Sequence, residues 1–185
     1  MAVSKYIQAV KDEAKGRALS TAWYREKIKE FGTPGALDLI RDGKRDNKPF
    51  YGKLNMFVYD PKWKKKLPYY DTFPLVLPLE NYPDGFLGIN MHYLPISLRV
   101  RLLDRLVDFS NNTKFDESTR LVVDYSKLKN IKLIKPTIHR YLSGQMKSQI
   151  RRIDADEFTI ATLLPVQRFK KQSAGAVWSE SKGMI

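Results

Sequence analysis

The spacing of hydrophobic residues changes along the chain and divides it into segments of different character. In residues 3–31, hydrophobic side chains such as Tyr6 recur at helical spacing. Gly32 and Pro34 end this pattern, and a polar, charged connector follows. Residues 1–48 are therefore predicted to form an extended helical N-terminal arm with a linker.

The middle of the chain favours short strands joined by fixed turns. Residues 57–95 contain nine aromatic residues and six of the chain's ten prolines. Because proline fixes its own backbone angle and pushes the preceding residue toward extended geometry, this composition is typical of strands and rigid turns. Hydrophobic positions alternate in three strings that predict strands, namely LNMFVYD (54–60), FPLVLPLE (73–80) and FLGINMHYL (86–94). A small, strongly bent antiparallel sheet or partial barrel is expected.

Helical spacing returns after Pro95. Ser97 can cap a helix in which Leu98, Leu102 and Leu106 share one face. Residues 119–125 are predicted to form a strand or short helix, residues 136–144 a short helix beginning at Pro136, and residues 146–153 a strand. A last helix is predicted to begin at the capping pair of Asp154 and Glu157 and to end at Pro165.

Together these patterns predict an α+β fold in which helices pack on the sheet. Its compact domain would span residues 49–165. Residues 166–185 are polar, with Phe169 and Trp178 as anchors, and are expected to form an irregular C-terminal arm.

Length and composition set the outer bounds. The 185 residues suit one medium domain with terminal arms. The absence of cysteine excludes a disulfide scaffold, a thiolate metal site and cysteine catalysis. No window approaches 18 consecutive apolar residues, and the first residues lack the apolar run of a secretory signal. A soluble protein with no membrane partner is therefore expected, either unexported or exported without a signal of this kind.

Positive charge is concentrated in one block. The chain has a net charge of +13, which favours polyanionic partners, nucleic acid above all. Residues 125–153 contain eight basic residues and no acid. Such a block repels itself unless DNA or an acidic protein surface lies opposite, and both alternatives remain open. The candidate nucleic-acid-binding residues are Lys127, Lys129, Lys132, Lys135, Arg140, Lys147, Arg151 and Arg152.

Two shorter clusters place cations beside aromatic rings, which suits phosphate contact with stacking, although such clusters are also common on solvated turns. They supply secondary basic contacts at Lys62, Lys64, Lys65, Lys66, Arg168, Lys170 and Lys171. Large aromatic residues in the arms and turns are candidate anchors of protein interfaces, namely Tyr6, Trp23, Trp63, Phe169 and Trp178.

The search for catalytic chemistry returns little. There is no phosphate-binding glycine loop and no nucleophile elbow. His92 is interpreted as a hydrogen-bonded packing residue and His139 as part of the basic face.

A metal-dependent nuclease would need converging carboxylates around a divalent ion. Asp124 and Lys127, with Asp104 or Asp108, could supply them. However, VVDYSK has one residue more than a strand-borne acid-x-Lys pair, and the helix acids resemble surface partners of neighbouring arginines. We therefore predict no catalytic residue, no metal site and no cofactor, and keep a nuclease as the lesser alternative.

The middle of the chain also carries a family resemblance. DPKWKKKLPYYDTFPLVLPLE, DGFLGINMHYLP and RVRLLDRL resemble a pattern in proteins of large contractile-tailed phages, and LLPVQRFKKQSAGAVWSESKGMI is similar to the ending of the same family. The two similar regions are residues 57–106 and 158–185. The family is that of the DNA end protectors, which are head-completion proteins.

The resemblance implies a non-enzymatic virion protein that is assembled in the host cytoplasm and occupies packaged DNA ends near the head–tail passage. Its implied partners are double-stranded DNA and other virion proteins, in a symmetric assembly of several copies. The alternative is a tail, neck or baseplate component whose basic block contacts acidic protein neighbours.

Overall fold

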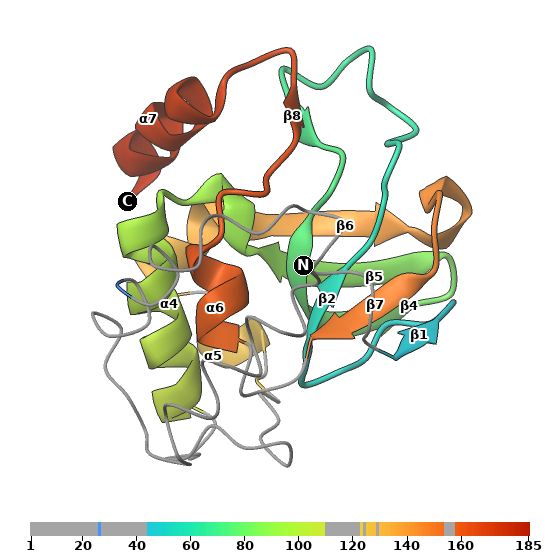
Figure 1. The fold of residues 1–185 in the computed structure, drawn as a ribbon, viewed down its shortest axis with the longest axis horizontal. Helices are drawn as coiled ribbons and strands as arrows, with labels where there is room; N and C mark the ends of the chain where they lie inside the picture. The colour runs from blue at the N-terminus through green and yellow to red at the C-terminus, as the bar shows by residue number, and fades with distance from the viewer. Residues whose placement is uncertain (1–25, 27–43, 110–122, 124, 129, 154–157) are drawn as a thin grey trace.

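A six-stranded antiparallel sheet forms the centre of the molecule. The computed structural model describes Glu26 and residues 44–109, 123, 125–128, 130–153 and 158–185. The strand order is β1-β7-β2-β4-β5-β6, and every neighbouring pair is antiparallel (Figure 1). The strands are β1 (Arg45–Asp46), β2 (Leu54–Met56), β4 (Leu75–Tyr82), β5 (Gly85–Asn90), β6 (Ile138–Leu142) and β7 (Ile150–Ile153).

Helices cover one face of this sheet, and the larger hydrophobic core lies between the two layers. Along β4, Leu75 and Leu77 point into this core while Val76 points to the opposite face, as strand geometry requires. The covering helices are α4 (Ile96–Phe109), α5 (Tyr125–Leu128) and α6 (Phe158–Leu163), with the 3-10 helices η1 (Met91–Tyr93) and η2 (Lys132–Thr137). In the part of the chain that the structure describes, no helix has both the length and the apolar character to span a membrane.

A second, smaller core lies on the opposite face of the sheet and is rich in aromatic rings. Phe57 and Tyr141 meet edge to face with ring centroids 5.3 Å apart, and Phe86 joins them. Edge-to-face pairs of this kind add stabilisation beyond their buried area. The sheet packs against a core on each face and does not close into a barrel, and the predicted α+β class with an antiparallel sheet and packed helices is confirmed.

The predicted helix over residues 136–144 is wrong. Pro136 lies within η2, which ends at Thr137. The strand β6 follows and pairs with β5, and η3 (Ser143–Gln145) comes after it. The pairing puts Tyr141 into the aromatic core. Tertiary pairing thus overrides a sequence in which Pro136 and Gly144 resemble helix boundaries.

The C-terminal segment is not the irregular arm that the sequence predicts. β8 (Phe169–Lys170) pairs with β3 (Tyr70–Asp71) in a separate two-stranded sheet. Helix α7 (Ala174–Met184) follows, and the Ser173 hydroxyl caps it by accepting a hydrogen bond from the Ala176 amide. Residues 169–184 are therefore largely regular structure, and α7 packs against η1 and η2.

Several predictions concern residues outside the described part of the chain. They include the helical arm up to residue 43, most of the segment 119–125, and the capping pair of Asp154 and Glu157. The end of the predicted linker is described, and there β1 forms an edge strand beside β7.

Gly85 is a position on β5 where the backbone of β6 leaves no room for a side chain. A Cβ atom built there would lie 1.9 Å from the Tyr141 carbonyl oxygen, whereas a Cβ on Gly144 would meet nothing within 4 Å. We expect Gly85→Ala to lower the free energy of unfolding by about 1–3 kcal/mol, because β6 must move and the aromatic core moves with it. Urea denaturation of both variants checks this, and equal stability of Gly85→Ala and Gly144→Ala would contradict it.

Candidate nucleic-acid interface

A buried carboxylate, Asp71, holds together segments that are far apart in the chain. Its side chain is 1% exposed. One carboxylate oxygen accepts hydrogen bonds from the backbone amides of Phe73 and Arg168, each at 3.0 Å. The other accepts from His92 Nδ1 at 2.7 Å and from Asn90 Nδ2 at 3.4 Å. Four donors therefore surround one carboxylate.

These donors decide its charge. Burial opposes ionisation, but the His92 ring and the two backbone amides outweigh it and lower the pKa of Asp71 below its usual value. Burial lowers the pKa of His92, against the opposing effect of Asp71. His92 is a fully buried, hydrogen-bonded packing residue, as the sequence predicts.

Arg99 forms a second buried polar centre next to the first. Its guanidinium donates to the carbonyl oxygens of Leu94 at 2.7 Å, Leu164 at 3.2 Å and His92 at 3.4 Å. The same group lies over the Trp178 ring, and the Trp178 indole N–H donates to the backbone carbonyl oxygen of His92 at 2.9 Å. Burial lowers the pKa of Arg99 to about 10, which leaves it charged at neutral pH. Arg99 thus connects α4, η1 and the C-terminal segment.

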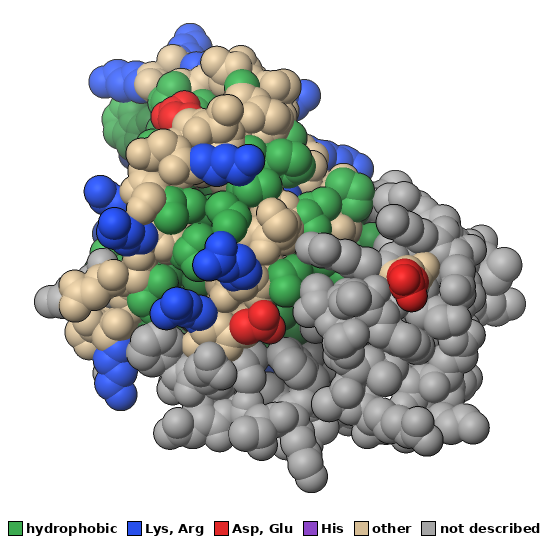
Figure 2. All heavy atoms as spheres, turned by 90° about the vertical axis from the view of Figure 1, so that its left-hand side faces the viewer, with side chains coloured by type: hydrophobic (Ala, Val, Ile, Leu, Met, Phe, Trp, Pro, Cys, Tyr) green, Lys and Arg blue, Asp and Glu red, His purple; other side chains and the backbone are tan. Residues whose placement is uncertain are grey.

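The basic block of the sequence is spread over different parts of the fold. β6 lies at one edge of the sheet, while β7 lies next to the opposite edge. η2 packs against both α4 and α7, and Lys132 and Lys135 are exposed on it. Figure 2 shows the face that carries α7 and α4, where lysine and arginine side chains are spread among apolar patches. Lys127 on α5 and Lys147 after η3 are also exposed, and Lys129 lies outside the described residues.

Arginines in the block do not all face solvent. Arg151 is 2% exposed, so its guanidinium is not available to a phosphate and the prediction that it binds nucleic acid is withdrawn. Arg152 is half-buried with its guanidinium over the Phe50 ring. Arg140 is exposed, pairs with Asp84 and lies 4.2 Å from the Tyr82 ring centroid. Strand alternation buries Arg151, and the charge count alone could not show this.

The shorter basic clusters have different local roles. Lys64 forms an exposed ion pair with Asp60 at 2.9 Å. Lys171 donates to the carbonyl oxygens of Lys65 at 3.1 Å and Leu67 at 2.7 Å, and thereby braces the 61–67 turn. The remaining predicted cations, Lys62, Lys65, Lys66, Arg168 and Lys170, have exposed side chains.

The predicted interface anchors also differ in place. Trp63 is 56% exposed on the 61–67 turn. Phe169 is half-buried against Tyr93, with ring centroids 5.2 Å apart, and Trp178 is half-buried in the Arg99 centre. Only Trp63 therefore presents a mostly open ring among these three. Tyr6 and Trp23 lie outside the described residues.

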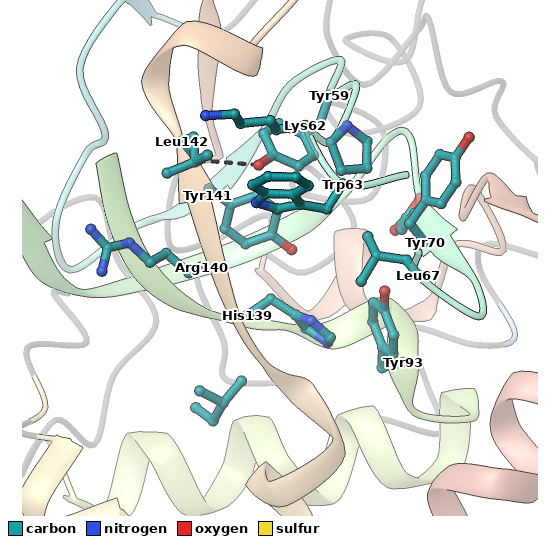
Figure 3. Close-up of a pocket in the computed structure, with 13 residues that line it drawn as sticks. Tyr59, Lys62, Trp63, Leu67, Tyr70, Tyr93, His139, Arg140, Tyr141 and Leu142 are labelled. Carbon is teal, nitrogen blue, oxygen red and sulfur yellow. Dashed lines mark hydrogen bonds between the residues drawn. The ribbon is translucent and has the colours of Figure 1, made fainter. Parts of the chain in front are cut away.

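An aromatic cleft of about 370 Å³, which no sequence pattern predicted, opens beside Trp63 (Figure 3). Lys62 and Arg140 also line it. The rings come from three separate parts of the chain. Only His139 and Tyr141, two positions apart on β6, have a spacing that predicts side chains on the same face of a strand. The aromatic lining consists of Tyr59, Trp63, Tyr70, Tyr93, His139 and Tyr141.

His139 belongs to this cleft and not to a charged basic face. Its ring stacks on Tyr93 with centroids 3.9 Å apart, and its Nε2 lies 3.2 Å from the Pro136 carbonyl oxygen. Burial lowers the pKa of His139 to about 4, so the ring is neutral at pH 7. A neutral ring that donates from Nε2 keeps Nδ1 as an acceptor.

The described residues contain no group of three or more side chains of the types that ligate metals. Asp124, which the nuclease hypothesis requires, lies outside the described part of the chain, and so does the Asp108 side chain. Asp104 lies on the exposed side of α4.

Comparison with known proteins gives one result. The family model described as phage T4 terminal DNA protecting protein matches residues 3–182. The chain belongs to this family. No significant match was found among the curated proteins or among the solved structures.

The terminal DNA protecting family match spans both regions of the sequence resemblance, and the fold joins those regions at Asp71 and Arg99. Asp71, His92 and Arg99 lie in the first region, and Leu164 and Trp178 lie in the second. The hydrogen bonds described above connect the two. Residues from both regions of the resemblance therefore meet in the interior of the molecule.

Proposed function

We propose that this chain is a non-enzymatic virion protein that binds the ends of packaged double-stranded DNA and occludes them. The match of residues 3–182 to a family described as protecting terminal DNA carries the proposal. The net charge of +13 supports it independently, because a polyanion is the partner that such a charge favours.

Occlusion requires phosphate contacts rather than recognition of base sequence. Lysines that neutralise phosphates release condensed counterions, which makes binding steeply dependent on salt. Exposed cations occur on several elements, including Lys127 on α5 and Lys132 and Lys135 on η2. Contacts of this kind position a protein on DNA without specifying its sequence. The bound protein would deny the end to exonucleases of the host.

We further propose that the protein acts near the head–tail passage, in several copies and in contact with other virion proteins. Val58 and Met184, which are 37% and 41% exposed, offer apolar side chains for such contacts. Binding of ends and contact with neighbours would then hold the packaged DNA in place.

The test compares linear duplex DNA with the same sequence closed into a circle. We expect salt-dependent binding that is tighter for the linear form, together with protection of its ends from an added exonuclease. Changing Lys127, Lys132 and Lys135 together to glutamine should weaken binding to all sequences and reduce the salt slope by roughly one for each phosphate that the variant no longer neutralises.

The matched control changes Lys44, Lys48 and Lys182 to glutamine, three exposed lysines outside α5 and η2. An equal loss of affinity in this control would show attraction by net charge alone and contradict a specific role for the lysines of α5 and η2. Equal affinity for circular and linear DNA, with no protection of ends, would contradict end binding and favour a tail, neck or baseplate component that contacts acidic proteins.

A further inference from the structure

The aromatic cleft beside Trp63 has the features of a binding site for a flat ring. Its volume of about 370 Å³ lies at the lower end of the range for small-ligand pockets. Figure 3 shows the rings of Trp63, Tyr93 and His139 bordering the same space, with Tyr59 and Tyr141 beside them. Several aromatic faces therefore meet around one opening.

Trp63 is the most exposed of these rings. At 56% exposure it is far more open than Tyr59 or Tyr93, which are both 7% exposed. Among the described residues, its ring contacts are with two ammonium groups, Lys62 at 5.3 Å and Lys66 at 5.2 Å from the centroid. An exposed tryptophan flanked by cations presents both a stacking surface and charges for a phosphate.

The turn that carries Trp63 is held in place before any ligand binds. The Lys171 ammonium group donates hydrogen bonds to two carbonyl oxygens of this turn, those of Lys65 and Leu67. The Asp60 backbone amide donates to the Gln145 carbonyl oxygen at 3.0 Å, and the Lys66 backbone amide donates to the Trp63 carbonyl oxygen at 2.8 Å. A braced turn loses little conformational entropy on binding, which favours affinity.

The opposite wall adds a polar group to the aromatic surface. His139 is neutral and stacked on Tyr93, and the Nδ1 atom of its ring keeps an acceptor lone pair. An exocyclic amine of a nucleobase is a suitable donor for such an atom. Arg140 stands at the edge of the same wall, and its ion pair with Asp84 is exposed, so a phosphate can replace the carboxylate at little cost.

We propose that this cleft binds an unpaired nucleobase at the end of a DNA strand, with Trp63 stacking on the base and Lys62 and Lys66 contacting its phosphates. The inference rests on the proposed function, because it takes DNA ends as the ligand. A duplex end is where a base can leave its stack at the lowest cost, whereas an internal base would first have to be unpaired. The cleft therefore gives a physical reason for preferring ends over internal duplex.

The test uses the complete chain and three duplexes of the same sequence: one blunt, one with a short single-stranded overhang and one with an abasic overhang of the same length. Fluorescence anisotropy at fixed salt measures their affinities. Because stacking of one base contributes about 1–3 kcal/mol, the base-bearing overhang should bind roughly 5- to 150-fold more tightly than the abasic one.

Trp63→Ala should abolish the difference between these two overhangs, while Trp63→Tyr should keep most of it. Tyr51→Ala is the matched control, because Tyr51 is 39% exposed but does not line the cleft. Lys62→Gln should weaken binding of both overhangs equally. Trp63 is exposed, so its variants should fold, and unchanged melting temperatures confirm this.

The outcomes separate this inference from the function on which it rests. Equal affinity of the wild type for base-bearing and abasic overhangs, with blunt ends still bound and protected, would overturn the nucleobase site alone and leave the cleft to a protein partner. An unchanged preference in Trp63→Ala would also overturn it. Failure to bind any of the three duplexes would overturn both proposals.

Discussion

Asp71→Ala is expected to lower the free energy of unfolding by about 3–5 kcal/mol, because several buried donors lose their acceptor and each costs about 1–3 kcal/mol when unsatisfied. The substitution removes the acceptor of four hydrogen bonds. It leaves His92 Nδ1 and two backbone amides without that partner inside the protein. Urea denaturation at neutral pH measures the decrease in stability. A decrease of this size would leave the chain partly unfolded at moderate temperature.

Asp60→Ala is the matched control. Asp60 also forms an ion pair, but its side chain is 38% exposed and that of its partner Lys64 is 47% exposed. Exposed pairs contribute little, so the control should denature within error of the wild type. A decrease in stability for Asp71→Ala no larger than for the control would contradict the role given to the buried carboxylate.

The pH dependence of stability provides a second readout at the same residue. The pKa of Asp71 is lower in the fold than in the unfolded chain, so its contribution is present above about pH 4 and is lost as the pH falls through the folded value. The pKa values of His92 and His139 are also lowered, so stability begins to fall below about pH 6.5. Asp71→Asn should remove the decrease below pH 4 and keep the decrease near pH 6. An unchanged profile below pH 4 would contradict this assignment.

Arg99→Ala should destabilise the protein by an amount similar to that for Asp71→Ala, about 3–4 kcal/mol, because buried acceptors lose their donor and each costs about 1–3 kcal/mol when unsatisfied. The acceptors are the carbonyl oxygens of His92, Leu94 and Leu164. Lysine should not rescue the variant, since an ammonium cannot reproduce the planar fork of donors.

Arg101 on the same helix provides the control, because its side chain is exposed. Arg101→Ala should leave the urea midpoint almost unchanged. Limited proteolysis adds a local measurement: in Arg99→Ala the segment from Leu164 to α7 should be cut before the sheet, because Arg99 bonds to it directly. Simultaneous cutting of both parts would show that Arg99 does not hold this segment in particular.

Much of the fold was readable from the sequence because local pattern and tertiary structure agree. The helix after Pro95 has a clean apolar face, and the strands around residues 54–94 are rich in hydrophobic residues that pack into a core on each face of the sheet. The basic block of residues 125–153 did not reveal which of its cations are exposed, because consecutive residues such as Arg151 and Arg152 lie on opposite faces of a strand.

The remaining features depend on contacts between distant residues. β6 resembles a helix locally and becomes a strand because β5 offers it a partner. α7 has few strongly apolar residues, so its apolar pattern gave a weak helical signal, and its packing uses Val177 and Ser181 one turn apart. The cleft is assembled from residues 59–71, 93 and 138–142, and no local pattern records that proximity.

The bond from the Arg168 amide to Asp71 also sets an order of events during synthesis. The two residues are 97 positions apart, so the carboxylate is enclosed only after the ribosome has made residue 168. At about 5–20 residues per second, synthesis of residue 168 follows that of Asp71 by roughly 5–20 s, and during that time the carboxylate lacks this donor. A chain that stops before residue 168 would have exposed lysines without a finished core, which makes it a target for cellular proteases.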